Sequence, residues 1–142
     1  MKRKVVKLFA AGAALALAGS FGAVSATGAE AATGTCSGTL VGHNPLSLNG
    51  TTYAYLDVYY NSTTGYNCAR TVHYGSTWGK PLFTSVTLNY VGRQGIASDS
   101  GTYAYYAGPV SLYGRGICVE ASANISPWPS SAYEVGAENR YC

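Results

Sequence analysis

The feature that most constrains this fold is the alternation of apolar and polar residues in short runs bounded by turn residues. Residues 52–60 show it best. Ala54, Leu56 and Val58 share one face of an extended chain there. The other face carries Tyr53, Tyr55, Asp57 and Tyr59. A period of two predicts a β-strand with one buried face. The polar segment 61–65, which ends in glycine, then predicts a hairpin whose second strand is 67–74.

The rest of the chain repeats this pattern. Further strands are expected at 39–41, 46–48, 82–91, 102–107, 110–113, 117–125 and 133–142. Asn49-Gly50 is a two-residue turn signal. Gly42–Pro45, the polar stretch 92–101 and Gly108-Pro109 are expected to interrupt the strands. No stretch has the length and 3.6-residue period of a helix. We therefore predict an all-β chain, a single small antiparallel β-sandwich or barrel with two disulfides.

The amino terminus has the three parts of an export signal. Lys2, Arg3, Lys4 and Lys7 precede an apolar run from Leu8 to Val24, and Ala29-Glu30-Ala31 supplies a small-residue cleavage site. The alternative is a membrane anchor, but glycine and serine dilute a run that is barely long enough to span a bilayer. The sequence predicts a cleaved signal peptide at 1–31 and a single secreted β domain at 32–142, with no membrane attachment after cleavage.

Charge excludes some partners for that domain. The formal net charge of +3 comes from the export signal. In 32–142 five bases, Arg70, Lys80, Arg93, Arg115 and Arg140, balance five acids, Asp57, Asp99, Glu120, Glu134 and Glu138. The bases are scattered, so binding to nucleic acid or anionic lipid through bulk charge is not expected.

Four cysteines, Cys36, Cys68, Cys118 and Cys142, lie in the mature part. In a short exported chain they predict two disulfides. Three pairings are possible, and Cys36–Cys68 with Cys118–Cys142 is favoured because each bond closes one half of the chain. Loops of that size stabilise by about 3 kcal/mol each. A metal site is the alternative, but no C-x-x-C occurs and neither His43 nor His73 has ligand-like spacing to a cysteine. No metal or cofactor is expected.

Catalytic candidates are few. His73 and Asp57 lie on paired strands and could form a triad with a serine, but no G-x-S-x-G elbow or comparable nucleophile context occurs. Glu120 with Glu134 or Glu138 would be the pair for sugar hydrolysis, yet their spacing does not single them out. We expect no enzyme.

Tyrosine is the unusual residue: all thirteen lie after residue 52. An aromatic ring with a polar tip can half-bury and still face water. The row of Tyr53, Tyr55 and Tyr59, with Trp78 and Trp128 in loops, is therefore a candidate binding surface. The alternative is that tyrosine fills the core and covers the sheet of a domain with few leucines and phenylalanines. Both interpretations stay open for the row.

Three segments resemble the spore-associated protein A family of small secreted actinomycete proteins. They are YYNSTTGYNC at 59–68, DSGTYAYYAGPV at 99–110 and GRGIC at 114–118, with Cys142 matching at the end. Val119–Ser122 departs from the family pattern. The resemblance implies secretion and association with the spore or aerial surface.

The expected function is that of a secreted, non-enzymatic protein of the spore or cell surface, acting by binding or as a structural component. Its partner would be a wall or spore-surface polymer or another surface protein. One alternative is a carbohydrate-binding module. The other is a secreted protease inhibitor, with 126–130 or 76–81 as the reactive loop.

Overall fold

A computed structural model describes residues 34–129 and 133–142. The predicted signal peptide lies outside the described residues. The strands are β1 (Thr39–Leu48), β2 (Thr51–Asn61), β3 (Tyr66–His73), β4 (Leu82–Tyr90), β5 (Ile96–Tyr103), β6 (Tyr106–Tyr113), β7 (Val119–Ile125) and β8 (Val135–Tyr141), with one 3-10 turn, η1 (Gly75–Thr77).

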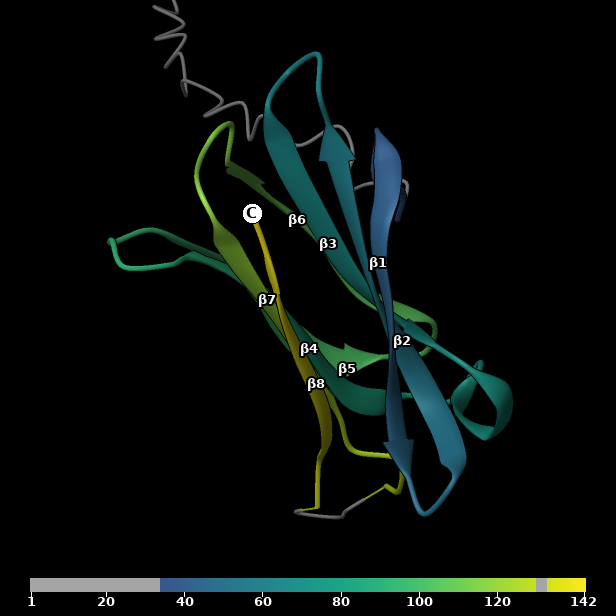
Figure 1. Ribbon diagram of the computed structural model, residues 1–142. Helices are drawn as coiled ribbons and strands as arrows, with labels where there is room; N and C mark the ends of the chain where they lie inside the picture. Colours follow the sequence, from purple (N-terminus) through teal and green to yellow (C-terminus); the bar gives the residue numbers. More distant parts are fainter. Residues whose placement is uncertain (1–33, 130–132) are drawn as a thin grey trace, which may run out of the picture.

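The strands form two antiparallel sheets that pack face to face, in the orders β1-β2-β3-β6 and β5-β4-β7-β8 (Figure 1). Each sheet turns one face inward, as the alternation predicts. The core consists of small and branched side chains from both sheets, among them Leu56, Val58, Val86, Leu88 and Ala121, all fully buried. The prediction of an all-β sandwich is confirmed. Within the described residues no helix is long and apolar enough to cross a membrane.

The predicted hairpin is β2–β3, in which Ala54 faces His73 and Asn61 faces Tyr66. The turn before it is also confirmed. Asn49 and Gly50 both have positive φ, 50° and 79°, as a tight hairpin turn with the twist of its strands requires.

The predicted break at Gly42–Pro45 is wrong, because β1 continues through it to Leu48. Since β1 is an edge strand, proline can sit in it without removing a bond from a central ladder. The pairing of β1 with β2 is irregular at two points, which leaves Val41 of β1 and Tyr53 of β2 without a partner in this pair of strands. Such bulges re-aim side chains.

Two other boundaries differ from the prediction. β5 occupies most of the predicted polar connection 92–101, and β6 runs through Gly108-Pro109. As an edge strand, β5 consists mainly of small polar residues and shows only partial burial on its inner face. It therefore lacks the apolar alternation on which the prediction depended.

Asp99 holds the turn between β5 and β6, where the chain passes from one sheet to the other. One carboxylate oxygen accepts a hydrogen bond from the Tyr103 hydroxyl at 2.6 Å, and the other accepts one from the Gly108 amide at 2.7 Å. The bond to the carboxylate raises the pKa of Tyr103 above its ordinary value. We call these two hydrogen bonds, both within the DSGTYAYYAGPV segment, the Asp99 staple.

Both favoured disulfides are present. Cys36–Cys68 ties the segment before β1 to β3, and Cys118–Cys142 joins the chain just before β7 to the residue after β8. Each bond therefore fixes one end of the described chain to a different sheet. Among the described residues no group of three or more potential metal ligands is found.

Candidate functional site

The outer face of the β1-β2-β3-β6 sheet gathers aromatic and charged side chains. We call it the tyrosine face and define it by His43, Tyr55, Asp57, Tyr59, Arg70 and Tyr74. Alternation along β2 places Tyr55, Asp57 and Tyr59 opposite the buried residues of the same strand. Cross-strand pairing then sets His43 and Arg70 on either side of Asp57.

Asp57 is the centre of this face. Its Oδ1 lies 2.6 Å from His43 Nδ1, and its Oδ2 lies 3.5 Å from an Arg70 terminal nitrogen. Asp57 is only 7% exposed. A carboxylate that has lost this much water needs charged or hydrogen-bonding partners. Two neighbouring strands provide them, one on each side.

Arg70 is held in place by other groups as well. One terminal nitrogen donates to the Gly34 carbonyl at 2.6 Å, and the other to the Tyr59 hydroxyl at 3.3 Å. Its guanidinium also lies 5.7 Å from the centre of the Tyr59 ring, which is cation–π distance. These contacts fix both the guanidinium and the Tyr59 ring before any ligand arrives.

Rings extend the face away from the charges. His43 stacks on Tyr55 with ring centroids 4.0 Å apart and an angle of 12° between the planes. Tyr74 meets Tyr55 edge-on at 5.1 Å. The His43 side chain is 54% exposed and Tyr74 is 52% exposed. A partly solvent-exposed aromatic surface thus lies beside the buried and paired carboxylate of Asp57.

The face presents an imidazole–carboxylate pair beside exposed aromatic rings. His43 with Asp57 has the form of a general base with its orienting acid. Within the described part of the chain, however, no serine, threonine or cysteine side chain is hydrogen bonded to His43. What the site offers is ring faces for stacking and fixed polar groups for hydrogen bonding.

The structure separates the predicted binding residues. Tyr55 and Tyr59 belong to the tyrosine face. Tyr53 does not, because it is the unpaired residue of a bulge and packs against the core and edge-on to Trp128, at 5.8 Å. Trp78 lies beyond η1 and pairs with Tyr105 at 4.9 Å. No ring contact between described residues joins these three groups.

The suggested triad of His73 with Asp57 is not formed, because the two side chains lie on opposite faces of the sheet. His73 is 2% exposed. Its Nδ1 donates to the Thr77 carbonyl at 3.0 Å, so Nε2 accepts from the Thr84 hydroxyl at 2.7 Å. Burial lowers the pKa of His73, and the bond to Thr77 opposes this only in part. Nor does Glu120 face another acid: its cross-strand partner is Arg140.

Sequence reasoning missed His43, Arg70 and Tyr74. The signal for His43 was present. If the ladder from the Asn49-Gly50 turn is continued back through Pro45, allowing one bulge, His43 falls opposite Asp57. Treating Gly42–Pro45 as a break concealed that register.

No protein-family model and no solved structure matches this chain. Spore-associated protein A of Streptomyces coelicolor is 34% identical to it over 135 residues, in an alignment that covers 84% of this chain and 84% of that protein. Identity at this level over most of both proteins supports the resemblance seen in the three sequence segments. The chain belongs to the spore-associated protein A family.

Proposed function

We propose that the mature domain is exported, stays at the spore or cell surface, and acts there without catalysis by binding a neutral surface polysaccharide through the tyrosine face. The observation that carries the proposal is the stacked His43–Tyr55 pair beside the fixed Asp57–Arg70 pair. Family membership supports the place of action, since the relative is named for association with spores.

The chemistry of the face suits sugar rings. The apolar face of a sugar ring can stack on Tyr55 or Tyr74, as aromatic side chains favour flat apolar partners with polar edges. Hydroxyl groups at the ring edge can then bond to His43 and to the Tyr59 hydroxyl. A sheet face offers length, so that several units of one polymer can lie across neighbouring strands.

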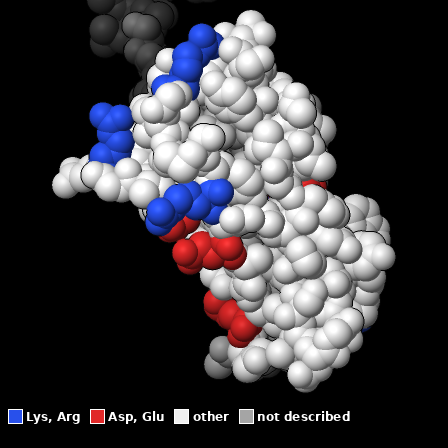
Figure 2. All heavy atoms as spheres, in the orientation of Figure 1, with Lys and Arg blue, Asp and Glu red and all other residues white. Residues whose placement is uncertain are grey.

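Charge also favours a neutral ligand. Asp57 is neutralised by Arg70 and by His43 when that ring is protonated. On the side of the molecule drawn in Figure 2, the charged residues lie mainly along the left edge of the view, and most of the remaining surface is uncharged. Recognition of a strongly charged polymer would need a cluster of opposite charge, which the tyrosine face does not supply.

A structural reason disfavours the protease-inhibitor alternative for the loop that begins at Ser126. The amide of Ser126 donates to the Phe83 carbonyl at 2.9 Å, and Trp128 packs on Tyr53. A reactive loop must project into a protease cleft, whereas these contacts hold this loop against the domain.

Co-sedimentation with wall material tests the proposal. We expect the mature domain to be retained on spore-wall and cell-wall polysaccharide that has been stripped of protein. Tyr55→Ala should weaken retention about tenfold, because both the ring stack and its apolar area are lost. Tyr105→Ala, an exposed aromatic outside the face, is the matched control.

Two results would contradict the proposal: equal retention of Tyr55→Ala and the unchanged domain, or no retention of the unchanged domain on stripped wall. Retention only on wall that still carries its proteins would identify a surface protein as the partner instead.

A further inference from the structure

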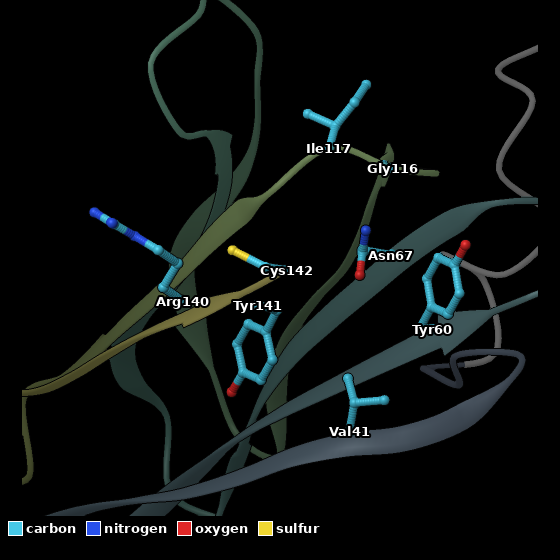
Figure 3. Close-up of a pocket in the computed structure, with 9 residues that line it drawn as sticks. Val41, Tyr60, Asn67, Gly116, Ile117, Arg140, Tyr141 and Cys142 are labelled. Atoms are coloured by element: carbon cyan, nitrogen blue, oxygen red, sulfur yellow. The ribbon is translucent and has the colours of Figure 1, made fainter.

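The two sheets leave an opening at one end of the sandwich, away from the tyrosine face. A pocket of about 560 Å³ lies there, within the range of small-molecule sites. Its walls include Tyr60 and Asn67 from one sheet and Tyr141 from the other, with Ile117 from the chain just before β7 and Val41 from the β1 bulge (Figure 3). No part of the proposed function uses this pocket.

Asn67 is the unusual residue of the pocket. It is 4% exposed and lies on the inner face of β3, in line with Ala69 and Thr71. No hydrogen bond joins its carboxamide to a described residue, and among the described residues Arg70 Nε is the only fully buried side-chain nitrogen or oxygen without a partner, so the carboxamide atoms reach the space of the pocket. The carboxamide therefore presents a donor and an acceptor to whatever fills the pocket.

Two glycines make room for the pocket walls. A Cβ atom at Gly114 would collide with the Asn67 amide nitrogen, and one at Gly42 would collide with the Tyr141 hydroxyl. Neither glycine has a positive φ, so backbone conformation does not explain them. Close approach does, since each lets a polar pocket residue sit against the main chain.

Tyr141 is fixed by polar contacts behind it. Its hydroxyl accepts from the Asn44 amide at 2.5 Å, and Asn44 in turn accepts from Asn139 at 3.0 Å. The hydroxyl is thus already used, and the ring remains available to the pocket. With Tyr60, Val41 and Ile117 it forms an apolar surround for the Asn67 carboxamide.

The only charged side chain in the described pocket lining belongs to Arg140. It lies at the rim with 60% of the side chain exposed, and Glu120 is 3.8 Å from it. The two charges offset one another, so a neutral ligand is favoured over a carboxylate.

We propose that this pocket binds a neutral ligand that carries a secondary amide on a compact ring, such as the acetamido group of an N-acetylated amino sugar. The ligand amide N–H donates to the Asn67 side-chain oxygen. Because a secondary amide is trans, its carbonyl lies on the opposite edge, so the Asn67 amide nitrogen donates to a ring oxygen of the ligand instead. The methyl group and ring pack against Tyr60, Tyr141 and Ile117. This site is independent of the tyrosine face.

Titration of the isotope-labelled mature domain with N-acetylglucosamine, followed by NMR, tests the proposal. We expect saturable shifts of the Asn67 side-chain amide and of the Gly116 and Ile117 backbone amides. Glucose, which has the ring but no acetamido group, should cause none. Asn67→Leu, which keeps the size of the side chain, should raise the Kd at least about tenfold. Asn124→Leu, near the end of β7 far from Ile117 and outside the pocket lining, is the matched control and should bind unchanged.

Ile117→Trp gives a second variant, in case Asn67→Leu does not fold. It fills the pocket and leaves Asn67 in place, and it should also abolish the shifts. The proposal is overturned if glucose gives the same shifts, if no saturable shift occurs, or if either folded variant binds like the unchanged domain. Tyr55→Ala should bind N-acetylglucosamine normally, which separates this site from the tyrosine face.

Discussion

At the scale of single residues, the two histidines show how strand alternation decides chemistry. His43 faces outward, stacks on Tyr55 and contacts a carboxylate. His73 faces inward and bonds only to neutral oxygens, those of Thr77 and Thr84. One ring is therefore available to a ligand, and the other is part of the core.

The buried histidine gives a prediction about pH. The pKa of His73 is lowered from 6.5 by burial, so the folded domain keeps the ring neutral. The unfolded chain takes up a proton as the pH falls through about 6.5, and stability should decrease from there downward. Urea unfolding at a series of pH values between pH 8 and pH 5 measures this decrease in the free energy of unfolding. His73→Asn should reduce the pH dependence of stability. His43→Gln should keep the part of that dependence that comes from His73. An unchanged slope in His73→Asn would contradict the assignment.

The Asp99 staple gives a second prediction. Asp99→Asn keeps the size of the side chain but removes the charge that strengthens the bonds from Tyr103 and Gly108. We expect a loss of about 1.5 kcal/mol in the free energy of unfolding, measured by urea denaturation. Glu138→Gln, an exposed acid on β8, should change stability little. A similar small effect for Asp99→Asn would mean that the staple does not stabilise the turn.

At the scale of elements, strands with one fully buried face were predictable, and so was the edge strand β8, whereas the bounds of the edge strands β1 and β5 were not. The segments 52–60, 82–91 and 117–125 correspond closely to β2, β4 and β7, because the core selects an apolar residue at every second position. β5 has water on its outer side and consists mainly of small polar residues, so its sequence lacks the apolar alternation that would distinguish it from a loop. For β1, the proline and glycine suggested a break that an edge position tolerates.

The candidate site was predictable in the same uneven way. Tyr55, Tyr59 and Asp57 follow from the alternation of one strand. His43 and Arg70 can be assigned to the site only if the register of the neighbouring strands is known. That register depends on bulges that the sequence does not mark. The bulge at Tyr53 also removes that residue from the row in which period-two counting placed it.

Gly42 gives a prediction about how the sheets are joined at their edges. Gly42→Ala should place a methyl group against the Tyr141 hydroxyl and separate β1 from β8. We expect a loss of about 1–3 kcal/mol in the free energy of unfolding, as for other overpacked sites. In a Tyr141→Ala background the same change should cost much less, and a double-mutant cycle measures the difference. If Gly42→Ala lowered the free energy of unfolding equally in both backgrounds, Tyr141 would not be the reason that position 42 requires glycine.

At the scale of the whole molecule, each sheet has its own covalent tie. Cys36–Cys68 belongs to the β1-β2-β3-β6 sheet and Cys118–Cys142 to the other. Such bonds are typical of exported domains whose small core stabilises them only modestly. The tyrosine face needs the first bond, since the segment it anchors brings the Gly34 carbonyl to Arg70. The second anchors Cys142, next to Tyr141 in the pocket wall.

The charge of the whole domain carries the last prediction. Five bases and five acids in 32–142 leave no net charge, and the tyrosine face pairs its own charges. Binding through ring stacking and neutral hydrogen bonds releases no counterions, so retention on stripped wall should change less than about twofold between about 50 mM and about 500 mM NaCl. A variant with lysines at the exposed positions 39, 47 and 51 tests the sensitivity of the assay, because on an anionic wall its extra retention should disappear at high salt. If the unchanged domain lost retention about tenfold over the same range, attraction between opposite charges would dominate the contact. The tyrosine face would then not be the main source of binding to the wall.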